Sequence, residues 1–411
     1  MTASDPSSTA ASVFWVFLKL GLTAFGGPVA HLAHFRAELV QRRQWMTETA
    51  YAQLVALCQF LPGPASSQVG MAMGLHRAGL PGMAAAWLGF TLPSAVALAM
   101  LGVGWVHFGN GVPSGLLQGL KIAAVAVVFH AVWGMTQQLC PDRARKGVLL
   151  VGLSLSLLSP GLIGQLGVLL LGGLWGWWWF SRSPHLGVAS SQSSLQATAS
   201  AASPVSRNLA MLCLLALLAL LVCLPIWSTH HPHPLAILVD TFFRTGALVF
   251  GGGHVVLPLL QAELVQPGLI DTHTFVAGYG ATQAVPGPLF TFAAFLGSVL
   301  AQSSSVMTSF AYAAVAVLAV FAPSFLMVIG LWPFWKSLQQ YPSVQHALQG
   351  VNAAVVGLLA AVFINPMALG TLHHPLDMLL CFAAIVALHA WKWAPWAVVG
   401  ACALIGGLLL T

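Results

Sequence analysis

Residues 17–28 read FLKLGLTAFGGP, and this stretch decides the architecture that we predict for the chain. A lysine, Lys19, stands inside an apolar run, and the run then breaks on Gly-Gly-Pro. Residues 243–253 read FRTGALVFGGG and repeat the pattern, with Arg244 in the place of the lysine. A cation beside a broken helix, present twice, predicts a site for a small anion inside a membrane.

The composition sets the class of protein. Of the 411 residues, 58% are hydrophobic and only 5% are charged, too few to cover the surface of a soluble domain of this size. Long apolar runs along the whole chain predict helices rather than the alternating strands of a barrel. We therefore predict an all-α polytopic membrane protein with about 13 hydrophobic segments, embedded in the lipid bilayer. The formal net charge of +6 is assigned to loops that flank the membrane, and no nucleic-acid partner is expected.

Changes in composition divide the chain into five predicted parts. No cleaved signal peptide is predicted, because the N-terminus has neither a basic n-region nor a small-residue cleavage site. The six cysteines are scattered without a Cys-x-x-Cys pair, which favours small core residues. The predicted parts are a tail (1–12), a first repeat (13–182), a Ser/Ala/Gln-rich linker (183–207), a connecting transmembrane helix (208–226) and a second repeat (237–411).

The two halves match each other in an ordered series of residues, which is strong evidence of an internal duplication. The shift between matched positions grows by only a few residues along the half. The matched pairs include Lys19/Arg244, Gly21/Gly246, Phe25/Phe250, Gly26/Gly251, Gly27/Gly252, Glu38/Glu263, Gln59/Gln283, Pro62/Pro286, Gly63/Gly287, Pro64/Pro288, Ser94/Ser324 and Gln118/Gln349.

The positions of lysine and arginine predict opposite orientations for the two halves. If the four broken segments are re-entrant hairpins, each half has four full crossings and the connecting helix adds an odd one, so the repeat is inverted. The basic loop residues then all lie on one side, which the positive-inside tendency assigns, with the N-terminus, to the cytoplasm. Thirteen full crossings are the alternative, and they invert the halves as well. The basic loop residues are Arg36, Arg42, Arg43, Arg77, Arg143, Arg145, Lys146, Arg182, Arg207, Lys336 and Lys392.

An inverted repeat with broken helices is a frequent design of secondary transporters, whose broken ends offer unpaired N–H groups to an anion. The cations would neutralise a divalent oxyanion, the glycines would allow close backbone approach, and the Pro-Gly-Pro tips and glutamines would complete the site. Snorkelling of the cations, plain helix-ending turns and interhelical glutamine hydrogen bonds are the alternatives. The predicted substrate-binding residues are Lys19, Arg244, Gly26, Gly27, Gly251, Gly252, Gln59, Gln283, Pro62, Gly63, Pro286 and Gly287.

Four further residues are candidates for gating: Glu38, Glu263, Lys121 and Asn352. For Glu38 the favoured alternative is a solvated helix face, paired with Arg42 at i+4. We read no carboxylate deep in an apolar run, and therefore expect no proton-relay acid.

Motifs of other protein classes are missing from the sequence. The histidines near position 231 read as a solvated loop, and no metal or cofactor is expected. The chain has no phosphate-binding P-loop, no His-Glu-x-x-His and no nucleophile elbow, so we expect neither an ATPase nor an enzyme.

The ordered motifs of both halves resemble the chromate ion transporter family in its long, two-domain form. They are residues 18–28, Leu61-Pro62-Gly63-Pro64, Phe250-Gly251-Gly252-Gly253 and Val285-Pro286-Gly287-Pro288. The resemblance implies a bacterial inner-membrane transporter that exports chromate, driven by the membrane potential or by exchange, and so confers resistance. The second half departs from the pattern because Gly253 stands where the first half has proline. Chromate shares its charge and shape with sulfate, so sulfate or other oxyanion uptake or exchange, or an anion channel, remain alternatives. A homodimer and a monomer are both compatible with the sequence.

Overall fold

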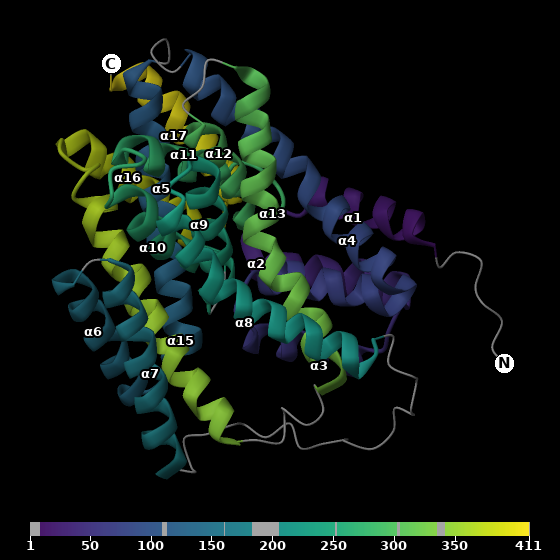
Figure 1. Cartoon of the computed structure of the whole chain (residues 1–411). Helices are drawn as coiled ribbons and strands as arrows, with labels where there is room; N and C mark the ends of the chain where they lie inside the picture. The colour runs from purple at the N-terminus through teal and green to yellow at the C-terminus, as the bar shows by residue number, and fades with distance from the viewer. Residues whose placement is uncertain are drawn as a thin grey trace.

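The computed structural model describes residues 9–108, 113–159, 161–182, 205–250, 253–301, 305–334 and 342–410. Every regular element in these ranges is a helix, which confirms the predicted all-α class (Figure 1). Most of the predicted linker (183–204) lies outside the described residues, as do the candidate site residues Gly251 and Gly252.

The helices of the first half are α1 (Ala10–Thr23), α2 (Gly27–Phe35), η1 (Arg36–Arg42), α3 (Glu48–Phe60), α4 (Ala65–Phe108), α5 (Ser114–Leu139), α6 (Arg143–Leu158) and α7 (Leu162–Arg182). The connecting helix is α8 (Arg207–His230). The second half contains α9 (Pro234–Leu248), η4 (Gly253–Val255), α10 (Val256–Leu260), η5 (Gln261–Val265), α11 (Thr272–Thr282), η6 (Leu289–Thr291), α12 (Phe292–Leu300), α13 (Val306–Leu331), η7 (Trp332–Phe334), α15 (Pro342–Val362), η8 (Phe363–Ala368), α16 (Pro375–His389) and α17 (Pro395–Leu409).

Five helices in the described ranges are long and apolar enough to cross a membrane, which makes the chain a polytopic membrane protein. Leucines on the connecting helix α8, such as Leu212, Leu215 and Leu218, are exposed, as expected of a face that contacts lipid. The five helices are Ala65–His107, Ser114–Leu139, Arg207–His230, Val306–Phe334 and Gln345–Ala368.

Helix α1 begins inside the segment that the sequence predicted to be a polar tail. Its first residue is Ala10, and the Thr9 side chain accepts a hydrogen bond from the Ser12 N–H at 3.2 Å. A threonine at the N-cap satisfies one of the free donors of the first turn, which explains the earlier start.

The helices break where the sequence predicted. Helix α1 ends before Gly26 and Gly27, whose φ angles of +99° and +77° lie in the left-handed region that favours glycine. Helices α3 and α4 are separated by the Pro62–Pro64 tip, and α11 and η6 by the Pro286–Pro288 tip. The flanking helices α1, α3 and α11 have 14, 13 and 11 residues, fewer than the roughly 20 that a full crossing needs.

The two halves interleave rather than form separate bodies. Helix α4 of the first half packs against α1 and also against α12, α5 packs against α17, and α7 and α6 pack against α15 (Figure 1). At several crossings a glycine lets two backbones touch. A side chain at Gly350 of α15 would meet the Gly172 carbonyl oxygen and lie 2.7 Å from Gly176 Cα, both on α7.

We expect Gly350→Ala to destabilise the protein by about 1–3 kcal/mol, because the added methyl forces α15 away from α7. The measurement is the melting temperature of the purified protein in detergent. Gly167→Ala on α7 is the control, since nothing lies within 4 Å of its added methyl. Equal melting temperatures for the two variants would contradict close packing at this crossing.

Candidate functional site

Two backbone hydrogen bonds join the halves crosswise at the broken segments. The Gly63 N–H in the first tip donates to the carbonyl of Val249, the residue after α9, at 2.6 Å. The Gly287 N–H in the second tip donates to the carbonyl of Ala24, the residue after α1, at 3.1 Å. Gly63 and Gly287 are equivalent in the two halves, and so are Ala24 and Val249. Each Pro-Gly-Pro tip therefore contacts the helix break of the other half.

The backbone conformation of both tips favours glycine, and a methyl group there would meet neighbouring side chains. Gly63 and Gly287 have φ angles of +114° and +111°. A methyl group at Gly63 would lie 2.6 Å from Gln68 Nε2 and 2.8 Å from Ser324 Oγ, and one at Gly287 would lie 2.7 Å from Ser94 Oγ. Because Ser94 and Ser324 are themselves a matched pair, each tip contacts the equivalent serine of the other half.

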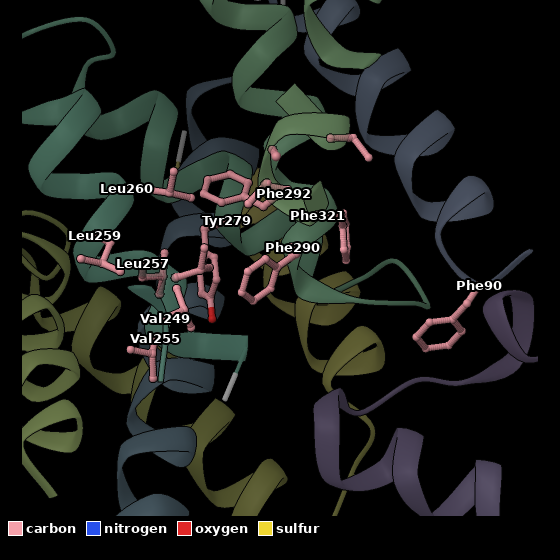
Figure 2. Packing of buried hydrophobic residues seen from close by; sticks show 14 of the residues in the cluster. Phe90, Val249, Val255, Leu257, Leu259, Leu260, Tyr279, Phe290, Phe292 and Phe321 are labelled. Carbon is pink, nitrogen blue, oxygen red and sulfur yellow. The ribbon is translucent and has the colours of Figure 1, made fainter. Parts of the chain in front are cut away.

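The two helix breaks also lie next to each other. A methyl group at Gly27 would lie 3.7 Å from His254 Nε2, and one at Gly253 would lie 3.4 Å from Pro28 Cγ. Aromatic and aliphatic side chains pack behind the second break, and Tyr279 extends its hydroxyl from this cluster (Figure 2). That hydroxyl lies 2.7 Å from His254 Nδ1. The breaks and tips of both halves thus form one central region.

Arg244 is not the unpaired cation that the sequence suggested. Its Nε and Nη2 donate to Asp240 at 2.8 Å, and its Nη1 and Nη2 donate to Glu263 at 3.0 Å. Asp240 is only 4% exposed, and the Ser228 hydroxyl donates to it at 3.1 Å. The expectation that no carboxylate lies deep in an apolar run is therefore wrong. Since Asp240 and Arg244 are on α9 and Glu263 is on η5, the ion pairs connect the helices on either side of the break.

Lys19 has a different environment from Arg244. It is exposed, on a face of α1 that also exposes Trp15 and Leu22. The two cations share no hydrogen-bond or ion-pair partner among the described residues. The position that matches Asp240 in the first half is Trp15, so α1 lacks the carboxylate that holds Arg244 in α9.

The two candidate glutamines also differ. Gln59 is exposed near the end of α3, whereas Gln283, directly after α11, is buried. Each precedes its tip, at Pro62 and Pro286, which are both half-buried. The structure therefore brings only Gln283 into the protein interior.

The four gating candidates lie in four different settings. Glu38 pairs with Arg42 at 3.0 Å and with Arg43 at 2.8 Å, so the i+4 pair predicted for a solvated helix face is present. Glu263 belongs to the Arg244 cluster. Lys121 Nζ lies 3.2 Å from His273 Nδ1, while the buried Asn352 side-chain oxygen has no partner within the described ranges.

Beyond the Glu38 pairs, a further ion pair joins the start of η1 to the start of α3. The Arg36 guanidinium donates to Glu48 at 2.8 Å and holds the pKa of that carboxyl below its usual range. The side chains of Arg36, Arg42 and Arg43 are all exposed, so their charges remain in water.

Sequence reasoning missed a group of buried polar side chains at the start of α4. Ser66, Ser67 and Gln68 directly follow the first tip and are each at most 3% exposed. His31 on α2 lies beside them, with Nδ1 3.3 Å from Ser66 Oγ. A run of three polar residues after Pro-Gly-Pro in an apolar segment was the available signal.

In the described part of the chain, no group of three or more His, Cys, Asp or Glu side chains could hold a metal ion.

A polytopic helical bundle whose helices break at its centre is the architecture of membrane transporters. The comparison with protein families agrees with this class. The chain belongs to the chromate transporter family, which it matches over residues 11–177 and 236–407. The family consists of transporters rather than enzymes.

Curated relatives match nearly the full length. A chromate transport protein of Cupriavidus metallidurans is 25% identical over 98% of this chain and 93% of its own length. A chromate transport protein of Pseudomonas aeruginosa is 26% identical over 95% and 89%. An uncharacterized transporter of Methanocaldococcus jannaschii is 26% identical over 88% and 85%. No solved structure matches the chain.

Proposed function

We propose that this chain is a secondary transporter that exports chromate across a bacterial inner membrane and so confers chromate resistance. Relatives that are named chromate transport proteins match it almost end to end. Export of a dianion from a cell that is negative inside is favoured by the membrane potential, by about 2.3 kcal/mol per charge at 100 mV. The sequence contains no P-loop to bind a nucleotide, which supports transport without ATP hydrolysis.

The observation that carries the proposal is the crosswise contact of the two tips with the two breaks. Interrupted helices leave N–H groups without intrahelical partners, and these can replace the water around an anion. Because each half supplies a tip to the other half's break, movement of one half alters the surroundings of both tips. This is the property that alternating access requires. We propose that the oxyanion passes between Gly63, Gly287 and the Gly26–Gly27 break.

In this proposal the halves, 13–182 and 237–411, form an inverted repeat joined by the linker (183–207) and helix α8. The short helices beside each break are re-entrant, and the basic loops and N-terminus face the cytoplasm. The exposed arginines Arg36, Arg42 and Arg43 lie in η1 and directly after it, within one such basic segment. Arg244 fixes the shape of the second break rather than facing the anion directly.

Flux into everted membrane vesicles tests the function. Vesicles from cells that express the chain should accumulate chromate above empty-vector vesicles, saturably, and more strongly with an imposed inside-positive potential. Sulfate, molybdate and phosphate are added as competitors. No uptake above the control ends the proposal. Flux that does not saturate indicates a channel, and sulfate uptake by whole cells without chromate export indicates sulfate import or exchange.

The exposure of Lys19 leads to a separate prediction. Its face of α1 also exposes Trp15 and Leu22, which favours a lysine that snorkels toward the membrane surface. We expect Lys19→Ala to keep the wild-type amount of folded protein and chromate flux within about twofold of wild type, because surface charges contribute little. Loss of flux at normal expression would instead place this amine at the substrate.

A further inference from the structure

The two tips have equivalent backbones but different side chains in the turn that follows. After the first tip, the first turn of α4 contains Ser66, Ser67 and Gln68, which are 3%, 2% and 0% exposed. At the spacing that aligns Gly63 with Gly287, the second half has Phe290, Thr291 and Phe292. Phe290 and Phe292 pack among Tyr279, Phe321 and the aliphatic residues of the second break (Figure 2). The turn after the first tip therefore has three buried polar side chains, whereas the matching turn of the second half has one, Thr291.

His31 adds a second polar group to the first tip. It is 1% exposed, and its Nδ1 lies 3.3 Å from Ser66 Oγ in the first turn of α4. The ring is also close to the carbonyl of Ala24, at the end of α1. At the spacing that aligns Lys19 with Arg244, the second half has Val256 in place of this histidine. The imidazole thus lies between the first break and the start of α4.

Two of these side chains are buried donors whose hydrogen-bonding capacity is unused. Ser67 Oγ and His31 Nε2 have no well-formed hydrogen bond within the described residues. When the Ser66 hydroxyl donates to Nδ1, the proton of the neutral ring is on Nε2, which is then a donor. The N–H groups of the first helical turn add to them, because only Gln68 N–H finds an acceptor there, the Pro64 carbonyl at 2.9 Å.

Burying a donor without an acceptor costs free energy, so an unused buried donor in the first turn of a helix favours a ligand rich in acceptors. A helix start adds the positive end of the helix dipole, and the straight first part of α4 runs from Ala65 to its kink at Ala78 and Gly79. A tetrahedral oxyanion has acceptor oxygens on all sides and no donor when fully ionised.

We propose that the start of α4, with Ser67 and His31, binds the oxyanion. The proposal rests on the function proposed above and names its substrate contacts. Gln68 supports the site by holding the tip, since its Nε2 donates to the Pro62 carbonyl at 2.6 Å.

The test compares Ser67→Ala and His31→Gln with the control Thr291→Val. Thr291 matches Ser67 in the second half, but its hydroxyl is already satisfied by the Pro288 carbonyl at 2.7 Å. We expect Ser67→Ala to raise the KM for chromate in everted vesicles about 10-fold or more, the effect of losing a hydrogen bond to a charged ligand. Thr291→Val should keep the KM within about twofold of wild type. Flux is divided by the amount of folded protein, measured by size-exclusion chromatography.

A binding measurement separates this inference from the proposed function. Molybdate, a tetrahedral dianion, should raise the melting temperature of the purified wild type and of Thr291→Val, but not of Ser67→Ala. Wild-type KM and wild-type molybdate stabilisation in both Ser67→Ala and His31→Gln would overturn the site while leaving transport intact. Molybdate stabilisation without chromate flux in the wild type would support the site and overturn the function. If the wild type showed no molybdate stabilisation and no chromate flux, both the site and the proposed function would be overturned.

Discussion

We expect Gly63→Ala to reduce the proposed chromate transport to less than a tenth of the wild-type flux, and Gly287→Ala to have the same effect. Each glycine has a φ angle near +110°, which costs an alanine about 1–3 kcal/mol. The added methyl at Gly63 would overlap Gln68 Nε2 at 2.6 Å and Ser324 Oγ at 2.8 Å. Overpacking of this kind costs about another 1–3 kcal/mol, a large share of the stability of a typical protein.

The effect on transport exceeds the effect on stability because the same glycines form the bonds between the halves. In the wild type the Gly63 N–H lies 2.6 Å from the Val249 carbonyl, and an alanine at position 63 would push this N–H away from it. An alanine at position 287 would weaken the bond to the Ala24 carbonyl in the same way. Flux in everted vesicles, divided by the amount of folded protein, is the measurement. We expect less than a tenth of wild-type flux even where folded protein remains, since a lost tip contact disorders the proposed path.

The matched control is Gly134→Ala in the long helix α5. Gly134 has an ordinary helical φ, and nothing lies within 4 Å of its added methyl. This variant should fold and transport as the wild type does. If Gly63→Ala and Gly287→Ala behaved like Gly134→Ala, the crosswise contact of tips and breaks would be irrelevant to transport.

Arg244→Ala is expected to remove most of the folded protein. The substitution leaves Asp240 and Glu263 buried side by side without their shared cation, and breaking a buried ion pair from one side costs about 3–5 kcal/mol. The melting temperature and the yield of monodisperse protein in detergent report the loss. Lys19→Ala, at the matched position of the first half, should show neither change because Lys19 is exposed.

Neutralising the whole cluster distinguishes a structural from a substrate-binding role for Arg244. A triple variant with Asp240→Asn, Arg244→Gln and Glu263→Gln removes all three charges together and keeps groups that can hydrogen-bond. We expect it to recover much of the lost stability, since unpaired buried charge is the main penalty. A well-folded Arg244→Ala that merely fails to transport would contradict the structural role and return Arg244 to the substrate.

The helix breaks could be predicted from the sequence because glycine and proline act locally. Gly26, Gly27 and the two Pro-Gly-Pro tips interrupt the helices in the structure at the places where their residue types forbid a regular helix. The duplication could be predicted as well, since it needs only a comparison of the chain with itself. The crosswise hydrogen bonds could not, because which tip meets which break depends on how the halves pack.

The partners of the cations were harder to predict for the same reason. Asp240 stands four residues before Arg244, a spacing that allows an ion pair on a helix, so this signal was present in the sequence. Glu263 reaches the same arginine only because the chain turns at the break between them. Lys19 has the same place in its half, yet it lacks such a partner because Trp15 stands where the second half has Asp240.

Chromate efflux from proteoliposomes that contain only the purified chain tests the central claim most directly. With chromate inside and an imposed inside-negative potential, we predict saturable efflux that grows with the potential, is slowed by molybdate and is absent with Gly63→Ala. Efflux no faster than from protein-free liposomes, or equal efflux from wild type and Gly63→Ala, would contradict transport of an oxyanion past the crossed tips.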